Sequence, residues 1–333
     1  MSRRLLLAVS GGIVATDALL LDGAGTVLAR ARAGSTSVKR IGAPQVVAVV
    51  DALRAKVLAA AGEPPDAQVH RVVALLADID LPAERRDLAA ALSTQFPGAG
   101  VTVENDIHAV LWAGLRRPAG AAVYCAEGIN AIARSATGRT FGYLALGTIS
   151  GDWGGALSLG REVLYAASRA EDGRGPETSL RFHVLAAFRR RSVRDVVETL
   201  QGAEDLEERL AGLLPVLTAA DAEGDPVARA ILDRLAEEVV TMTRAAMERA
   251  LVPPSGSDII LAGHVLTQGY ERLDNRIDEL FAERLPGAAV ARLTLPPVAG
   301  AALAALGAEH GGPVGEVVSA RLQESLHRLP EAG

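Results

Sequence analysis

Near its beginning the chain reads Leu5-Leu-Leu-Ala-Val-Ser-Gly-Gly-Ile-Val-Ala-Thr-Asp-Ala-Leu-Leu-Leu-Asp-Gly-Ala-Gly-Thr-Val-Leu-Ala29. A first apolar run, 5–9, stops at Gly11-Gly12, and an Asp-Gly turn separates a second run, 18–21, from a third that follows Gly25. An Asp-Gly turn between two apolar runs is typical of a β-hairpin. This stretch therefore predicts three antiparallel strands.

Beyond these strands, helix-like and strand-like patterns alternate. Apolar residues recur at helical spacing in three segments and form continuous runs in two: 45–61, 82–92 and 107–115 for the helices, 69–77 and 101–104 for the strands. Arg-Arg-Pro-Ala-Gly at 116–120 is the best linker, because Pro and Gly break helix periodicity. The pattern predicts one complete α/β lobe over residues 1–117.

After the linker the chain repeats its opening pattern. Apolar residues at 121–125 and 132–134 flank a glycine-containing turn, which predicts a second hairpin-led unit. Long helical patterns occupy about 180–250, and a strand is expected at 258–262. We expect a second α/β lobe with a helical insertion over 118–300, and a helical segment, 301–333, that packs back on the first lobe. The fold class is thus α/β, a duplicated pair of lobes with a cleft between them.

The amino-acid composition limits which binding partners and which cellular compartment are expected. The 333 residues are 49% hydrophobic but only 3% aromatic, and the formal net charge is −6. Few aromatic rings and a negative charge argue against nucleic acid and anionic membranes as partners. Cys125 is the only cysteine, which excludes an intrachain disulfide, an iron–sulfur cluster and a cysteine-rich zinc site held by one chain. The apolar run at 5–9 is too short for a signal peptide, so a cytoplasmic protein is expected.

One glycine-rich stretch carries a family resemblance. It reads Gly147-Thr-Ile-Ser-Gly-Asp-Trp-Gly-Gly-Ala-Leu-Ser-Leu-Gly-Arg-Glu162 and is followed by Arg169-Ala-Glu-Asp-Gly-Arg-Gly175. It resembles the loop Gly-His-x-x-Gly-Asp-Glu-Gly-Ser-Gly, and then a helix with Gly-Arg-Glu, of the N-acetylglucosamine kinase family and its BadF-type ATPase relatives. The match runs in order from Leu5 to Leu306. It implies the actin-like ATPase, or sugar kinase, fold of two ribonuclease-H-like lobes.

The resemblance also implies a sugar site. Glu104-Asn105-Asp106 is similar to the segment that supplies the catalytic aspartate, so Asp106 would orient the sugar hydroxyl and accept its proton. The alternative for Asp106 is a helix N-cap, and for Asp152 an Asx-turn. The other residues expected to bind substrate, beside Asp106 and Asp152, are Ser35, Thr36, Ser37, Asn105, Asn130 and Gly147. Asn130 is as readily a turn-stabilising residue.

The phosphate-binding loops depart from the family pattern. The first, Asp-Gly-Gly-Gly-Thr-Lys-Thr in the family, is here Ser10-Gly-Gly-Ile-Val-Ala-Thr16, so a serine replaces the carboxylate that would hold hydrated Mg²⁺. The second, Gly-Thr-Gly-Ser-Asn, reads Ala126-Glu-Gly-Ile-Asn130, and Glu127 would repel phosphate. In the adenosine loop His264 replaces a glycine. The degenerate nucleotide site comprises Ser10, Gly11, Gly12, Thr16, Glu127, Gly128, Gly263 and His264.

Two functions remain open. In the first, a kinase fold binds an amino sugar or related cyclitol, with ATP-dependent phosphoryl transfer lost or strongly reduced. In the second, an active N-acetylhexosamine or amino-sugar kinase uses atypical phosphate contacts, with Thr16 and Asp17 near enough to supply some of them. ATP and Mg²⁺ are the cofactors at issue, and the scattered histidines indicate no zinc or other metal site. The family resemblance further implies a homodimer.

Overall fold

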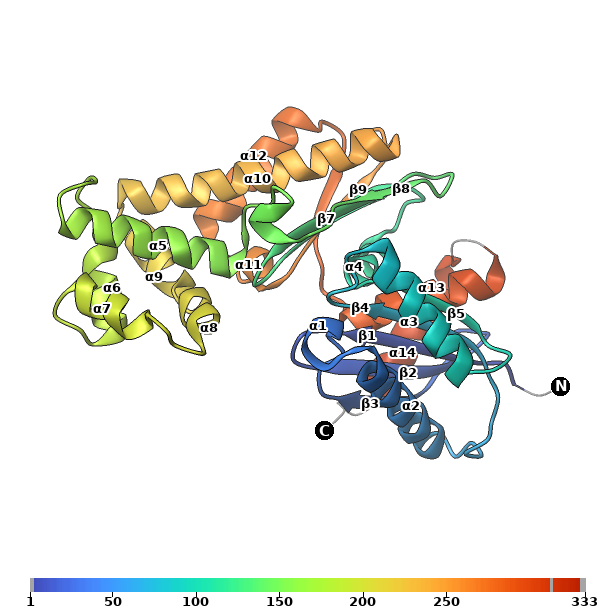
Figure 1. Ribbon diagram of the computed structural model, residues 1–333. Helices are drawn as coiled ribbons and strands as arrows, with labels where there is room; N and C mark the ends of the chain where they lie inside the picture. Colours follow the sequence, from blue (N-terminus) through green and yellow to red (C-terminus); the bar gives the residue numbers. More distant parts are fainter. Residues whose placement is uncertain (1–2, 312–313, 330–333) are drawn as a thin grey trace. The chain divides into compact units, whose positions relative to one another are not determined.

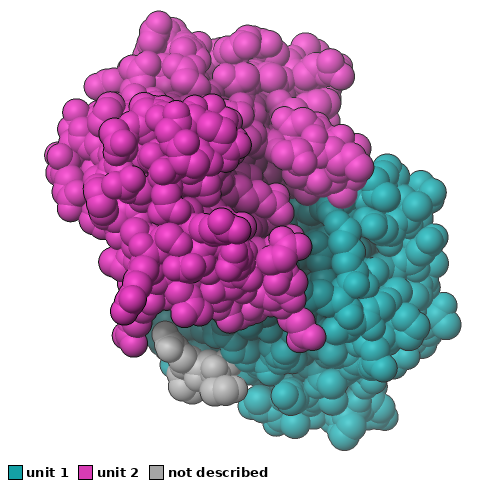
Figure 2. Space-filling view, turned by 60° about the vertical axis from the view of Figure 1, so that its left-hand side comes forward, with its two compact units in different colours: residues 1–118, 293–333 teal, residues 119–292 magenta. Residues whose placement is uncertain are grey.

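The computed structural model describes residues 3–311 and 314–329 of the chain. The predicted C-terminal segment 301–333 therefore lies partly outside the described residues. The chain folds into two compact units, coloured separately in Figure 2: unit 1 comprises residues 1–118 and 293–333, and unit 2 comprises residues 119–292. The return to unit 1 thus comes at Leu293, earlier than the boundary at 301 that the sequence pattern suggested. The reason is that Val298 and Ala299 already belong to a core of unit 1.

A mixed five-stranded sheet forms the centre of unit 1. Its strands are β1 (Leu5–Gly11), β2 (Thr16–Asp22), β3 (Val27–Ala33), β4 (Val69–Leu76) and β5 (Gly100–Asn105), in the order β3-β2-β1-β4-β5. The first three are antiparallel, which confirms the prediction from residues 5–29. β4 runs parallel to β1, and β5 runs parallel to β4.

Helices cover both faces of this sheet, as Figure 1 shows for unit 1. The core on one face is formed with α2 (Ala43–Ala60) and α3 (Pro82–Gln95). The core on the other face is formed with α4 (Ile107–Gly114), α13 (Pro297–His310) and α14 (Glu316–Arg328). Successive β1 residues point to opposite cores, Leu5 and Leu7 to the first and Leu6 and Ala8 to the second. A strand buried on both faces reads as a continuous apolar run, which is what residues 5–9 show.

Unit 2 has a second sheet of the same topology. Its strands are β6 (Gly120–Cys125), β7 (Ile129–Arg134), β8 (Thr140–Gly142), β9 (Asp258–Ala262) and β10 (Ala289–Arg292), in the order β10-β9-β6-β7-β8. A hairpin-led antiparallel trio is again followed by two strands parallel to its first member. The two sheets correspond strand for strand, and the duplication predicted from the sequence is confirmed. β10 was not predicted.

The helices of unit 2 form its core with one face of this sheet. They are α5 (Gly155–Glu171), α6 (Leu180–Phe188), α7 (Val193–Leu200), α8 (Leu206–Ala211), α9 (Leu214–Ala222), α10 (Pro226–Ala250), α11 (His264–Thr267) and α12 (Glu271–Arg284). Asp225 begins the longest of them, α10, because its side chain accepts hydrogen bonds from the amides of Val227 and Ala228. In the part of the chain that the structure describes, no helix has the length and apolar character needed to cross a membrane.

Candidate functional site

The carboxyl ends of β1, β4 and β5 lie at one edge of the unit 1 sheet, because these strands run parallel. The amide of Ala77 donates to the carbonyl of Gly11 at 2.8 Å, and the amide of Asp106 donates to the carbonyl of Leu76 at 3.1 Å. Gly11 and Asp106, which the sequence placed in separate segments, are therefore neighbours at this edge. Ligands of α/β folds are usually bound at such an edge.

Gly11 lies directly against the loop that follows β3. A Cβ added to Gly11 would come within 1.8 Å of Thr36 Oγ1 and 2.8 Å of the Leu76 side chain, so only glycine fits there. The hydroxyls of Thr36 and Thr16 lie 2.9 Å apart in the interior. Both threonines are fully buried. Thr16 thus faces the interior of unit 1, against Thr36.

The segment 35–37, expected to contact sugar, is also held internally. The Ser37 hydroxyl donates to Asp78 Oδ2 and accepts from the Arg40 amide as the N-cap of α1 (Val38–Ile41). Ser35 Oγ accepts from the Ser37 amide at 3.1 Å. Thr36 and Ser37 are fully buried, whereas Ser35 is partly exposed. Of the three, Ser35 is the residue that offers a ligand part of its surface.

Asp106 occupies the N-cap position of α4, directly before Ile107, but its side chain makes no capping hydrogen bond. Asn105 fills that role, because its Oδ1 accepts from the Ile107 amide at 3.1 Å. Asp106 thus holds the N-cap position, while the side-chain bond of the cap comes from Asn105. The carboxylate remains available for another task, and Asn105, expected to bind substrate, also serves the backbone.

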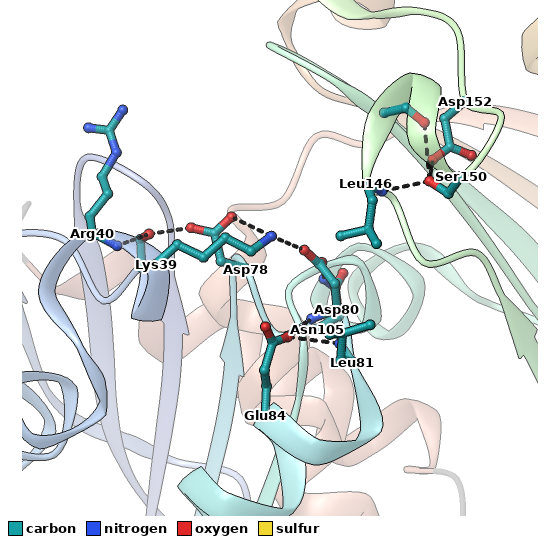
Figure 3. Close-up of polar contacts among 12 residues, drawn as sticks. Lys39, Arg40, Asp78, Asp80, Leu81, Glu84, Asn105, Leu146, Ser150 and Asp152 are labelled. Carbon is teal, nitrogen blue, oxygen red and sulfur yellow. Dashed lines mark hydrogen bonds and ion pairs between the residues drawn. The ribbon is translucent and has the colours of Figure 1, made fainter.

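An acidic cluster that sequence reasoning missed surrounds Asp106. Asp78 and Asp80, in the loop after β4, are close enough to act on its carboxyl. Figure 3 shows Lys39 reaching both of them. Lys39 Nζ lies 2.6 Å from Asp80 Oδ2 and 3.7 Å from Asp78 Oδ1. Asp78 adopts a left-handed backbone with φ 64°, uncommon for a residue other than glycine. The motif Asp-x-Asp directly after a buried strand was the signal that could have revealed them.

The cluster changes the chemistry of Asp106. Burial, together with the neighbouring carboxylates of Asp80 and Asp78, raises the pKa of Asp106 to about 7. Burial likewise raises the pKa of Asp80 above its ordinary value, although Lys39 opposes this. Near neutral pH the Asp106 carboxyl can thus either accept or donate a proton. This is the range in which a general base works best.

In unit 2 the degenerate nucleotide residues also gather at one edge. β6 and β9 run parallel, and the turns that follow them hold Glu127-Gly128 and Gly263-His264. A Cβ on Gly263, whose φ is 86°, would lie 2.2 Å from the Cys125 carbonyl oxygen, so this position requires glycine. Glu127 is exposed and His264 half-buried. The structure thus brings the two altered loops side by side within this unit.

The Asp152 loop is closed by its own hydrogen bonds. The Asp152 amide donates to the Gly147 carbonyl at 3.0 Å, and Ser150 Oγ lies within hydrogen-bond distance of Asp152 Oδ2 and accepts from the Leu146 amide (Figure 3). Asp152 is only 5% exposed. The carboxylate is therefore oriented by Ser150. Asn130, which lies on β7, accepts from the amide of Ala131 at 2.7 Å and is 9% exposed.

Trp153, which follows Asp152, is fixed by α5 and α10. The Arg234 guanidinium lies 3.8 Å from the centroid of the indole ring, and Trp153 Nε1 donates to Glu162 Oε1 at 3.3 Å. Arg234 also pairs with Glu162 at 3.2 Å. A cation over one face of the ring leaves at most the other face for stacking on a sugar.

The first phosphate loop differs from the family pattern at the position expected to hold the metal. Ser10 offers no charge to a metal, and the nearby Asp17 pairs with Arg30 at 3.0 Å. Within residues 3–311 and 314–329, no group of three or more His, Cys, Asp or Glu side chains could hold a metal ion. The exposed Glu127 adds negative charge in the second loop. Of the two residues that could replace these contacts, Thr16 is fully buried and Asp17 is paired with Arg30.

Comparison with known proteins agrees with this architecture. A putative N-acetylglucosamine kinase from Chromobacterium violaceum superposes with a TM-score of 0.68 at 23% identity, covering 90% of this chain and 98% of that one. A ROK family glucokinase from Streptomyces griseus, solved with glucose and AMPPNP, gives a TM-score of 0.54 at 20% identity, with 90% and 98% covered. At these identities the likeness shows the fold: the actin-like ATPase and sugar kinase fold is confirmed.

Sequence comparison gives the family. N-acetylmuramic acid/N-acetylglucosamine kinase of Clostridium acetobutylicum is 27% identical over 148 residues, which are 44% of this chain and 48% of that protein. The matched part spans about half the length of that curated relative. A model of the BadF/BadG/BcrA/BcrD ATPase family matches residues 9–307, nearly the whole chain, and the protein therefore belongs to this family.

Proposed function

We propose that this protein binds an N-acetylated amino sugar, or a related cyclitol, and that its ATP-dependent phosphoryl transfer is lost or strongly reduced. The proposal rests on one observation: both residues that could replace the missing contacts of the first phosphate loop already interact with other side chains. Thr16 is buried against Thr36 at 2.9 Å, and Asp17 is paired with Arg30 at 3.0 Å. Phosphoryl transfer depends on positive charge and donors around the phosphates, and these loops supply few.

The sugar side of the proposal rests on retained polar groups. Asp106 in unit 1 and Asp152 in unit 2 both keep a carboxylate. In the described part of each unit, no cation pairs with either carboxylate. The printed names of the relatives, N-acetylglucosamine and N-acetylmuramic acid kinases, indicate the substrate class. A carboxylate accepts two hydroxyl hydrogen bonds readily, which suits a polyol.

Calorimetry separates binding from transfer. The full chain is titrated with N-acetylglucosamine, and separately with Mg·ATP, and ADP release is followed with both present. We expect saturable binding of the sugar, no saturable binding of Mg·ATP in the millimolar range, and no turnover above background. An Asp106→Ala variant should lose sugar affinity. Saturable Mg·ATP binding with robust turnover would contradict the lost-transfer proposal, and absence of any sugar binding would contradict the sugar assignment.

A second candidate is an active kinase with unconventional phosphate contacts. The pKa of Asp106, raised to about 7, favours it, because that value suits a general base at neutral pH and has no evident use in a protein that only binds. In this case ADP release would depend on sugar, and Asp106→Asn would abolish it while leaving Mg·ATP binding intact. The same assay thus decides between the two candidates.

We also infer that the protein is a homodimer formed through the helical part of unit 2. Exposed apolar side chains gather on its helices: Tyr165 on α5 and Phe182 on α6 are each 58% exposed, and Val197 on α7 is 41% exposed. A contiguous apolar patch is typical of an interface, and the inference is that these side chains contribute to one. Sedimentation should give about twice the 34.5 kDa chain mass, and Phe182→Glu should shift it toward the monomer. A wild-type monomer at micromolar concentration would contradict the inference.

A further inference from the structure

A continuous chain of contacts connects Asp80 to the start of α4. Asp80 Oδ1 accepts from Asn105 Nδ2 at 2.9 Å, and Asn105 Oδ1 accepts from the Ile107 amide at 3.1 Å. Asp106 lies between the two residues that this chain fixes. The Asp106 backbone is held on one side by the bond from its amide to the Leu76 carbonyl, at 3.1 Å, and Asn105 holds the next amide, that of Ile107.

Asp80 is itself held from several sides. Its other oxygen, Oδ2, lies 2.6 Å from Lys39 Nζ, and its side chain is only 7% exposed. Its amide and that of Leu81 donate to Glu84 Oε2, at 2.9 and 2.8 Å, so α3 fixes the loop (Figure 3). The Asp80 carboxylate is therefore bound by a cation and by a side-chain amide, and its backbone is fixed, so it has little freedom to move.

The other charged groups of these elements are paired away from Asp106. Arg85 of α3 binds Glu104 of β5 at 2.8 Å, and His108 of α4 lies 3.9 Å from that same carboxylate. Burial lowers the pKa of His108, so it is neutral near pH 7. Within unit 1, the carboxylates of Asp80 and Asp78 act on Asp106, and Lys39 lies beside both.

We propose that Asp80 is a positioning residue for Asp106: it holds Asn105, and through Asn105 the first turn of α4, next to the Asp106 carboxyl. The sugar-binding consequence rests on the proposed function, but the positioning itself does not. Asp80 contacts neither Asp106 nor any reacting atom in this scheme, and it acts through Asn105 and through its field.

Two substitutions of Asp80 separate the effect of its hydrogen bond to Asn105 from the effect of its charge. Asp80→Asn keeps an oxygen for Asn105 but removes the charge, whereas Asp80→Ala removes both. Asp78→Asn removes a neighbouring charge without touching Asn105. Asp87→Asn, on the exposed side of α3, is the matched control. The first measurement uses the full chain with ¹³C-labelled aspartate, in which the Asp106 carboxyl is assigned by its loss in Asp106→Asn and titrated from pH 4 to 9.

We expect the Asp106 pKa to fall in Asp80→Asn, Asp80→Ala and Asp78→Asn, and to stay in place in Asp87→Asn. Hydrogen exchange at the Ile107 amide should accelerate about tenfold or more in Asp80→Ala but not in Asp78→Asn or Asp80→Asn. The affinity for N-acetylglucosamine at pH 8, where Asp106 is ionised in every variant, should fall about tenfold in Asp80→Ala and less than twofold in Asp80→Asn.

Failure of this inference and failure of the proposed function are distinguishable. If Asp80→Ala leaves the Asp106 titration and the Ile107 exchange unchanged, Asp80 does not position Asp106, whatever the sugar affinity. If both change as expected while wild type binds no sugar, the positioning holds and the sugar assignment fails. Circular dichroism and the unfolding midpoint show whether each variant is folded, and Asp80→Asn, which preserves the hydrogen bond, provides the test should Asp80→Ala not fold.

Discussion

The hydroxyl oxygens of Thr16 and Thr36 lie 2.9 Å apart, and both side chains are completely buried in unit 1. One residue begins β2 and the other belongs to the loop after β3, so this bond joins the first phosphate loop to the segment expected to contact sugar. It also lies against Gly11, where a Cβ would come within 1.8 Å of Thr36 Oγ1.

Thr36→Val should therefore destabilise the protein by about 1–3 kcal/mol, because the Thr16 hydroxyl is left buried without its partner. The double variant Thr16→Val/Thr36→Val should recover most of this loss, since both polar groups are replaced by methyl groups of similar shape. Urea unfolding of the two single variants and the double variant gives the coupling. Additive losses would show that the two hydroxyls do not depend on one another.

Nucleotide binding should be restorable. The variant Ser10→Asp/Ala15→Lys/Glu127→Thr/His264→Gly returns a metal-holding carboxylate, a cation and a neutral donor, and it removes a repulsive charge and a bulky ring. We expect measurable Mg·ATP affinity in calorimetry where wild type shows none. Adding Asp106→Asn should leave that affinity intact, because Asp106 serves the sugar. If the restored variant folds but still does not bind Mg·ATP, the altered loops are not what prevents nucleotide binding.

Stability should depend on the ionisation of Asp106. Its pKa is about 7 in the folded chain against an ordinary 3.8, so the native state holds a proton that the unfolded state releases between these values. Stability from this group is therefore lost as pH rises from about 4 to about 7, by up to about 4 kcal/mol. The Asp106→Asn variant has no carboxyl to ionise at this position. Its stability relative to wild type should therefore increase as the pH rises from about 4 to about 7. Denaturant midpoints of both proteins at pH 5 and pH 8 measure it, and a difference that does not change with pH would contradict the expectation.

Asp152→Ala should weaken binding of N-acetylglucosamine about tenfold or more, because the carboxylate that Ser150 orients is lost. Glu204→Ala, which removes an exposed carboxylate elsewhere in unit 2, should leave the affinity unchanged. Isothermal titration at constant pH compares the two variants. Equal affinities in wild type and Asp152→Ala would remove Asp152 from the sugar site.

Much of the fold could be predicted from local pattern. The apolar runs at 5–9 and 69–77 became β1 and β4, and the Asp-Gly turn at 22–23 became the hairpin between β2 and β3. The segment 82–92 became the larger part of α3, which begins at Pro82 as expected. β10 was missed because it is short and only partly buried, so it has no strong apolar run.

The candidate site was less accessible to the same reasoning. Asp106 and Asp152 were singled out by resemblance, and their environments then came from structure. Asp80 was overlooked because its importance depends on Lys39 and Asn105, which lie far from it in sequence. Asn105 meets it when β4 and β5 pair, and Lys39 reaches it from α1.

By itself, the sequence determined the strand and helix order, the duplicated topology and the changes in the phosphate loops, since these depend on apolar periodicity and on residue identity at known turns. Only the tertiary structure decided which polar groups are already in use. Thr16, Ser37 and Asn105 were each compatible with a ligand in sequence, and each is bonded inside unit 1. The physical reason is that hydrogen bonds and electrostatic fields depend on distance in space, and parallel strands bring together residues that are distant along the chain.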